Sequence, residues 1–303
     1  MNDNFEFKHI PVMPNEVIEL LKINKSGIYI DGTLGGGGHS EQILKKLGDK
    51  GRLIGVDQDF EAISASKKGL SKFKDKIIFV QDNFKNIDLI LDNLKILKVD
   101  GILLDLGVSS YQLDTPQRGF SLKKEADAVL DMRMDQKQRL SANEVINDYS
   151  EEELRQIFFE LGEEPFSKSI ARAIAIRRQE KPISTANELL DVIRGATPPK
   201  YRFSRHGHYA SKIFRSLRME VNHELPALRQ VLPQAVKRLK KGGRLVVISF
   251  HSLEDRIVKH FFREVKNEGI VEILTKKPLM PTSQEITLNP RAESAKLRAI
   301  EKI

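Results

Sequence analysis

The feature that most constrains the fold is a short β-type run that ends in an aspartate and breaks into a glycine cluster, between Ile28 and Ser40. Glycine lets the backbone take a positive φ and lets a ligand approach the main chain closely. Helical character resumes over residues 41–47. A strand, a glycine-rich loop and a helix N-terminus in this order are typical of the nucleotide-binding corner of an open α/β sheet.

The glycine loop lacks the two common phosphate-binding motifs, which limits the ligands that it can bind. A G-x-G-x-x-G/A fingerprint ends at Ser40 if it starts at Gly35 and at Glu41 if it starts at Gly36, and no G-K-[ST] is present. The next strand ends in Asp57, where a carboxylate usually accepts hydrogen bonds from ribose hydroxyls. With Asp31 as a second carboxylate, the pattern favours a nucleoside without phosphates, commonly S-adenosylmethionine, over a tight loop that binds nothing.

Composition sets outer limits. A chain of 303 residues allows one large domain or two smaller ones. Cysteine is absent, which excludes disulfides and thiolate metal sites and fits a cytoplasmic protein. His206 and His208 have no acidic co-ligand close in sequence, so we expect no metal. We also expect no membrane span and no signal peptide.

Positive charge is concentrated in one segment. Residues 166–218 hold twelve Lys or Arg against three Asp or Glu, whereas the whole chain has a net charge of +8. Aromatic residues are interleaved with these cations, which predicts phosphate contacts and base stacking on RNA; a solvated helical face with core aromatics is the alternative. The candidate RNA-binding residues are Arg177, Arg178, Arg202, Arg205, Lys212 and Arg215.

The order of elements predicts one sheet interrupted by a helical insertion. Strand-like runs at residues 27–31, 52–57, 77–81 and 100–106 alternate with helical patterns such as 60–70 and 86–97, which indicates a parallel sheet. From 112 to 223 no strand is evident, and three capping boxes begin at Ser141, Ser150 and Thr185. A helix over 224–241, a turn at Gly242-Gly243 and strands at 244–250, 271–274 and 295–300 complete the sheet. The expected domains are 1–111 with 224–303, and 112–223, in which 195–209 forms a mobile loop.

Candidate reactive groups lie at strand ends, where open sheets gather them. Asp105 closes the fourth strand and can contact the cofactor or the reacting amine, or cap the following turn. Residues 81–84 end the third strand and suit either adenine recognition or capping. His251, after the fifth strand, can face the pocket or serve as a structural hydrogen-bonding group, and Ser252 with Asp255 resembles an N-cap arrangement.

Several motifs together resemble a known family. They are Asp31-Gly32-Thr33 with Gly37-Gly38-His39-Ser40, Asp100 to Ser110, Gln112-Leu113-Asp114, Arg118-Gly119-Phe120-Ser121, Leu130 to Asp135, Gly162-Glu163-Glu164, Ser249 to Lys259 and Asn289-Pro290-Arg291-Ala292. The chain resembles the bacterial 16S rRNA cytosine-N4 methyltransferases, long called MraW, from about His9 to Arg298. The resemblance implies a class I, Rossmann-like methyltransferase sheet with a helical insertion after strand four.

The resemblance also implies the chemistry. A methyl group would pass from S-adenosylmethionine to the exocyclic N4 of a cytidine in the decoding centre of 16S rRNA, within the small ribosomal subunit. The cofactor contacts carry over to Gly37, Gly38, His39, Asp57, Phe84, Asp105 and Gln112. Asp105 or a nearby backbone carbonyl would accept a hydrogen bond from N4 and orient it.

The chain departs from the family pattern in two places. Ala128-Val129 stands where Gly-Pro is usual, and residues 209–218 differ from the usual Pro-Ala-Thr-Arg-Thr-Phe-Gln-Ala-Leu-Arg. Both departures concern contacts with RNA. Two other functions are alternatives to methyl transfer. One is a nicotinamide oxidoreductase, which the incomplete glycine fingerprint disfavours, and the other is an RNA-binding ribosome-assembly factor with a vestigial pocket.

Overall fold

The computed structural model describes residues 11–122, 128–203 and 208–303. The chain divides into two compact units, residues 1–109 with 225–303 and residues 110–224. The first unit is therefore built from two separated parts of the chain, and the second is an insertion between them. The expected insertion spanned residues 112–223.

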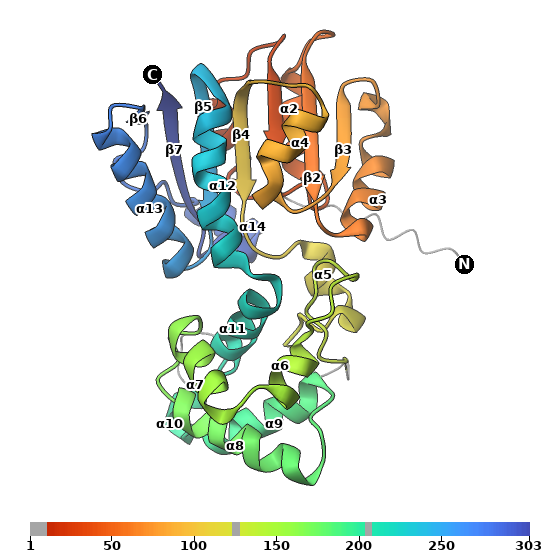
Figure 1. The fold of residues 1–303 in the computed structure, drawn as a ribbon, viewed down its shortest axis with the longest axis vertical. Helices are drawn as coiled ribbons and strands as arrows, with labels where there is room; N and C mark the ends of the chain where they lie inside the picture. Colours follow the sequence, from red (N-terminus) through yellow and green to blue (C-terminus); the bar gives the residue numbers. More distant parts are fainter. Residues whose placement is uncertain (1–10, 123–127, 204–207) are drawn as a thin grey trace. The chain divides into compact units, whose positions relative to one another are not determined.

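The first unit is built on a seven-stranded sheet with the order β3-β2-β1-β4-β5-β7-β6. The strands are β1 Ile28–Asp31, β2 Arg52–Asp57, β3 Ile77–Gln81, β4 Val99–Asp105, β5 Leu239–Ser249, β6 Val271–Ile273 and β7 Lys296–Lys302. Strands β1 to β5 are parallel, and β7 runs antiparallel to both β5 and β6 (Figure 1). This confirms the Rossmann-like sheet.

Helices cover both faces of this sheet. They are α1 Pro14–Leu21, α2 Gly38–Lys46, α3 Phe60–Gly69, α4 Ile87–Asn93, α12 Glu224–Arg238, α13 Ser252–Asn267 and α14 Ser283–Leu288. Apolar residues of α4, α12 and α13 pack on one face, with α12 and α13 in front of the strands in Figure 1. Those of α1, α2 and α3 pack on the other. Because both faces are covered, the central strands are continuous apolar runs.

The strand order reverses between β1 and β4. Strand β1 pairs with β2 on one side and with β4 on the other, so the connections leave the carboxyl ends of these strands in opposite directions. Ligands of open α/β sheets bind at such a switch point. The fold therefore predicts a ligand-binding site at the carboxyl ends of β1, β2 and β4.

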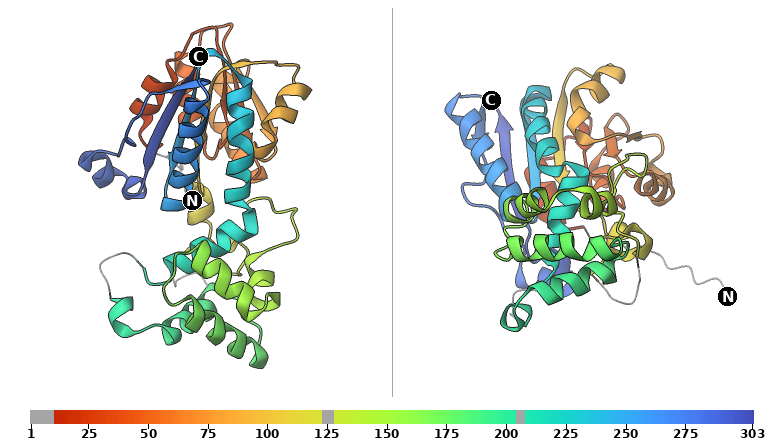
Figure 2. Two further views of the ribbon diagram at one scale, coloured as in Figure 1. Left: turned by 60° about the vertical axis from the view of Figure 1, so that its left-hand side comes forward. Right: turned by 60° about the horizontal axis from the view of Figure 1, so that its bottom comes forward.

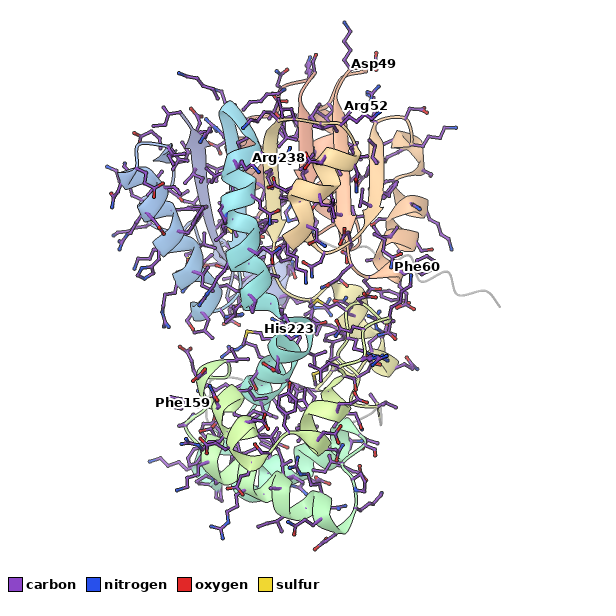
Figure 3. The ribbon with its side chains drawn as sticks, viewed as in Figure 1. Asp49, Arg52, Phe60, Phe159, His223 and Arg238 are labelled. Atoms are coloured by element: carbon purple, nitrogen blue, oxygen red, sulfur yellow. The ribbon has the colours of Figure 1, made fainter. Side chains whose placement is uncertain are left out.

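Two helix ends were predicted wrongly. The helix expected over 86–97 is α4, which ends at Asn93. The helix expected over 224–241 ends at Arg238, and β5 begins at Leu239, so Gly242-Gly243 lies inside a strand. The pairing of β4 with β5 shifts between Val99 and Gly101, and Gly242 has a φ of +77°. A glycine at positive φ within a bulge keeps both halves of the strand in the ladder. Arg238, labelled in Figure 3, is buried and pairs with Asp88 and Asp92 of α4.

The second unit is helical over the residues that are described. Its helices are α5 Ser110–Asp114, α6 Ala142–Asp148, α7 Glu151–Glu160, α8 Ser167–Glu180, α9 Ala186–Ala196, α10 Pro199–Arg202 and α11 Ser211–Asn222. All three predicted capping boxes are present, at the starts of α6, α7 and α9. Helix α8 packs against both α7 and α9, as two further views show (Figure 2). The predicted loop at 195–209 is partly helical, because it includes α10.

Candidate functional site

The glycine loop after β1 is closed tightly onto α2. Gly35 and Gly37 have φ values of +49° and +79°, and Gly37 is the N-cap residue of α2 while Gly38 is its first residue. The Gly37 N–H donates to the Leu34 carbonyl at 2.8 Å. A Cβ on Gly37 would lie 3.0 Å from Ser66 Oγ, so a side chain would be crowded as well as strained. The sequence signal of the glycine cluster corresponds to this turn.

Asp57 joins this loop to the end of β2. Its Oδ2 accepts the N–H of Gly35 at 2.8 Å, and its Oδ1 accepts the N–H of Asp59 at 2.9 Å. Burial raises the pKa of Asp57 to about 6, although these two N–H groups lower it. Each carboxylate oxygen keeps a second lone pair for another donor. The group is thus held in place and can still accept hydrogen bonds from a ligand.

Asp31 lies at the end of β1, behind the glycine loop. Its side chain is 1 % exposed, and its Oδ2 accepts the hydroxyl of Ser40 at 2.7 Å. Its Oδ1 accepts the N–H of Thr33 at 3.2 Å. Burial raises the pKa of Asp31 above its ordinary value. Asp31 therefore ties the first turn of α2 to β1 and shapes the loop from behind.

Asp105 and His39 form a pair at the end of β4. His39 Nε2 lies 3.5 Å from Asp105 Oδ2, and the Asp105 N–H donates to Thr33 Oγ1 at 2.7 Å. Asp105 Oδ1 is shielded from solvent and has no hydrogen-bond partner among the described residues. Asp105 caps no helix, since α5 begins five residues later. A buried carboxylate oxygen without a donor makes Asp105 a candidate for contact with a ligand.

The charge state of His39 depends on three acids. Burial acts to lower the pKa of His39, but Asp105, Asp31 and Glu285 of α14 together raise it above its ordinary value. The imidazole is 5 % exposed and reaches Asp105 from the first turn of α2. His39 Nε2 therefore lies beside Asp105 Oδ2 as a charge contact, and among the described residues neither Nε2 nor Asp105 Oδ1 has a hydrogen-bond partner.

The remaining residues expected to contact the cofactor, Phe84 and Gln112, lie in different units. Phe84 begins the short 3-10 helix η2, Phe84–Asn86, and is partly buried against the core cluster. Its neighbour Asn83 caps this helix by accepting the Lys85 N–H at 3.0 Å, and so has the capping role. Gln112 lies on α5 in the second unit, where it is buried.

His251 is a cap, and the predicted Ser252–Asp255 cap is wrong. His251 is the N-cap residue of α13, and Glu254 completes a capping box by accepting the His251 N–H. The His251 and Glu254 side chains are buried together, with Nε2 and Oε1 3.2 Å apart. Asp255 instead pairs with Arg298 of β7. Histidine is not among the usual N-cap residues, so the sequence pattern favoured the neighbouring serine.

The candidate RNA-binding cations of the second unit are partly engaged. Each of the five that are described donates to a backbone carbonyl of the same unit: Arg177 to Lys181, Arg178 to Ile146, Arg202 to Arg194, Lys212 to Glu163 and Arg215 to Gly162. Arg205 lies outside the described residues. Three further cations, Lys168, Arg172 and Lys200, are exposed and were not singled out from the sequence. A shallow groove of about 400 Å³ runs between α8 and α9 beside Arg172.

Within the ranges that the structure covers, no cluster of three or more His, Cys, Asp or Glu could hold a metal ion. None of the helices described is both long enough and apolar enough to cross a lipid bilayer.

Comparisons with known proteins agree along almost the whole chain. A family model described as "MraW methylase family" matches residues 6–303. Ribosomal RNA small subunit methyltransferase H from Clostridium botulinum (strain Loch Maree) is 51% identical over 98% of this chain and 100% of its own length. The protein of the same name from Finegoldia magna is 47% identical, over 98% and 99% of the two chains.

Solved structures are more distant. An rRNA methylase from Streptococcus thermophilus matches with a TM-score of 0.44 and 11% identity, over 96% of this chain and 93% of that one. The family model and the two methyltransferase H sequences match nearly the whole chain. This chain therefore belongs to the MraW methylase family.

Proposed function

We propose that the protein transfers a methyl group from S-adenosylmethionine to the exocyclic N4 of a cytidine in 16S rRNA. The observation that carries this proposal is the likeness, over nearly the whole chain, to relatives named ribosomal RNA small subunit methyltransferase H. The choice of N4, and of a cytidine in the decoding centre, comes from the resemblance of the motifs together to the 16S rRNA cytosine-N4 methyltransferases.

The first unit would hold the cofactor. Asp57 would accept the ribose hydroxyls, because its two oxygens are fixed by backbone N–H groups and keep free lone pairs. The glycine turn would let the cofactor lie against the main chain at Gly37 and Gly38, and Phe84 and His39 would complete the contacts of this unit. When bound, the sulfonium cofactor supplies an electrophilic methyl group.

The reacting amine would be oriented by Asp105. The N4 lone pair of cytosine is delocalised into the ring, so the amine is a poor nucleophile and needs positioning. Asp105 Oδ1, buried and without a donor, suits a hydrogen bond from the N4 amino group. His39 Nε2, 3.5 Å from Asp105 Oδ2, would help to hold the carboxylate in place through its charge. The methylated amine is acidic until it loses a proton, so a strong base is not required.

The substrate would be held by the second unit. The target base must leave its stack to reach a buried carboxylate, and such flipping is easiest in a single-stranded segment. The basic half of the second unit, residues 166–218, would bind the phosphates around it. The working partner would be 16S rRNA in the small ribosomal subunit, in the cytoplasm.

The proposal is tested by methyl transfer with mapping. Purified protein and labelled S-adenosylmethionine are incubated with 16S rRNA, free and assembled into small subunits, and the modified nucleotide is located by mass spectrometry. N4-methylation of one cytidine supports the proposal. Methylation of another atom would overturn the N4 assignment, and no cofactor binding by calorimetry would favour the assembly-factor alternative.

A further inference from the structure

The basic half of the second unit contains four aromatic side chains that were interleaved with cations in the sequence: Tyr201, Phe203, Tyr209 and Phe214. Only a ring with an open face can stack on a base. The structure separates these four rings by their surroundings.

Three of the four rings are already in use. Phe214 is 5 % exposed and belongs to the core of the unit. Tyr209 stacks on His208 with ring centroids 4.3 Å apart, and its hydroxyl donates to the Leu190 carbonyl. Tyr201 packs edge-on against Phe166 at 4.8 Å, and its hydroxyl donates to Glu164 Oε2 at 2.6 Å. Phe203 differs, because it is 85 % exposed.

The backbone at Phe203 is nevertheless fixed by hydrogen bonds. It is the C-cap residue of α10, and its N–H donates to the Pro199 carbonyl at 3.2 Å. The same short helix is anchored two residues earlier by Tyr201, whose acceptor Glu164 is completely buried. Arg202 fixes the helix to the end of α9 through the Arg194 carbonyl at 3.1 Å. An exposed ring on an anchored turn loses little further freedom when a ligand stacks on it.

The charge around Phe203 selects the kind of ligand. Lys200 and Arg202 lie on α10 itself, and Arg194 lies near the end of the preceding helix α9. In the second unit residues 166–218 carry twelve Lys or Arg against three Asp or Glu, whereas residues 110–165 carry seven against thirteen. An aromatic face among cations suits single-stranded nucleic acid, in which phosphates meet the cations and bases stack on rings.

We propose that Phe203 is a stacking platform for an unpaired base of the RNA substrate, with Lys200 and Arg202 contacting the phosphates on either side. The proposal rests on the function proposed above and adds the residue that receives a base other than the target cytidine. A single exposed phenylalanine is common on protein surfaces, so a matched control is needed.

The chain offers that control. Phe159, labelled in Figure 3, is 65 % exposed on α7 of the same unit. Its helix carries four acids, Glu151, Glu152, Glu153 and Glu160, against one cation, Arg155, so its net charge is negative and disfavours phosphates. Phe159 and Phe203 therefore share residue type and unit, are both largely exposed, and differ in the net charge of the segments that carry them.

The first experiment uses fluorescence of the full-length protein. The chain has no tryptophan, so Phe203→Trp and Phe159→Trp each introduce one isolated fluorophore. A single-stranded 16S rRNA fragment that contains the target cytidine is titrated into each variant. We expect quenching in Phe203→Trp, because a base stacks on the indole, and none in Phe159→Trp. No quenching in the first variant, or equal quenching in both, would overturn the proposal.

The second experiment measures affinity against salt. Phe203→Ala should weaken RNA binding by about 5- to 150-fold, the range that corresponds to loss of one stacked base. The slope of affinity against salt should be unchanged, because no phosphate contact is lost. Phe159→Ala should bind as the wild type does. Wild-type affinity in Phe203→Ala would contradict the proposal, whereas a wild-type protein that neither binds nor methylates this RNA would instead refute the proposed function.

Discussion

At the scale of single residues, the pair formed by His39 and Asp105 combines burial, charge and an unpartnered oxygen in one place. The sequence placed Asp105 correctly at a strand end, because parallel strands gather reactive groups there. It did not reveal that His39 faces Asp105, since the two side chains come from residues 66 positions apart. Nor did the sequence reveal that the Asp31 carboxylate accepts hydrogen bonds from Ser40 and Thr33.

Replacement of Asp105 should separate chemistry from binding. We expect Asp105→Ala to lower the single-turnover rate of methyl transfer by about 100-fold or more, because the amine loses its orienting acceptor. RNA affinity should be retained. His39→Gln should cause a smaller loss, since the amide can still donate to Asp105. A near wild-type rate in Asp105→Ala would assign this residue a purely structural role.

Asp57 should make cofactor affinity depend on pH. Its pKa is about 6 in the fold against an ordinary 3.8, so its contribution to stability is complete below about pH 4 and is lost as the pH rises to about 6. Ribose hydroxyls need the ionised carboxylate as acceptor, so affinity should rise over the same range. Urea unfolding and calorimetric titration check both trends. Asp57→Asn should flatten both, and equal pH profiles for the two proteins would contradict the assignment.

Removal of the Asp57 carboxylate should cause a measurable loss of cofactor affinity. At a pH where Asp57 is ionised, Asp57→Ala should weaken binding of S-adenosylmethionine by about 1.5–3 kcal/mol, the range for hydrogen bonds to a charged group. Circular dichroism shows whether the fold is kept. Unchanged affinity in a folded variant would exclude the ribose contact.

At the scale of elements, local signals were strong where side chains cap the backbone in the usual way. The boxes that start at Ser141, Ser150 and Thr185 mark helix starts in sequence and structure alike. The cap at His251 and the bulge at Gly242 were missed for physical reasons. An imidazole is a rare cap, and a glycine pair signals a turn unless the neighbouring strand shows that the ladder continues past it.

The glycine turn should tolerate no side chain. Gly37→Ala should destabilise the protein by about 1–2 kcal/mol and weaken cofactor binding, because an L-residue is strained at positive φ and its Cβ meets Ser66. Gly69→Ala, at the end of α3 with no atom within 4 Å of the added carbon, is the matched control. It should be neutral or slightly stabilising. Thermal unfolding compares the two, and equal effects would show that the strain at Gly37 is not important.

At the scale of the whole molecule, the sequence indicated two units from the change in periodicity after residue 108 and from the charged segment. The structure has compact units at 1–109 with 225–303 and at 110–224. The sequence could not show which cations are free. Arg178, for example, donates to the Ile146 carbonyl at 2.7 Å, whereas Lys168 and Arg172 on the same helix are exposed.

Charge reversal should therefore be directed at the exposed cations. The variant Lys168→Glu, Arg172→Glu and Lys200→Glu should weaken RNA binding and reduce the slope of log affinity against log salt by about 2 to 3, as expected for three lost phosphate contacts. The charge-matched variant Lys137→Glu, Arg139→Glu and Arg155→Glu, from the acidic half of the unit, should have little effect. Cofactor affinity should be the same in both. An unchanged slope in the first variant would move the RNA surface elsewhere.

The central claim is that Asp105 presents one buried oxygen to the N4 amine of a cytidine in 16S rRNA. The most direct measurement is single-turnover transfer of a labelled methyl group to 16S rRNA by the wild type and by Asp105→Ala, which removes both carboxylate oxygens, with the product nucleoside identified by mass spectrometry. We predict N4-methylcytidine at one position with the wild type and a rate at least about 100-fold lower with the variant. A product methylated on another atom, or equal rates for the two proteins, would contradict the claim.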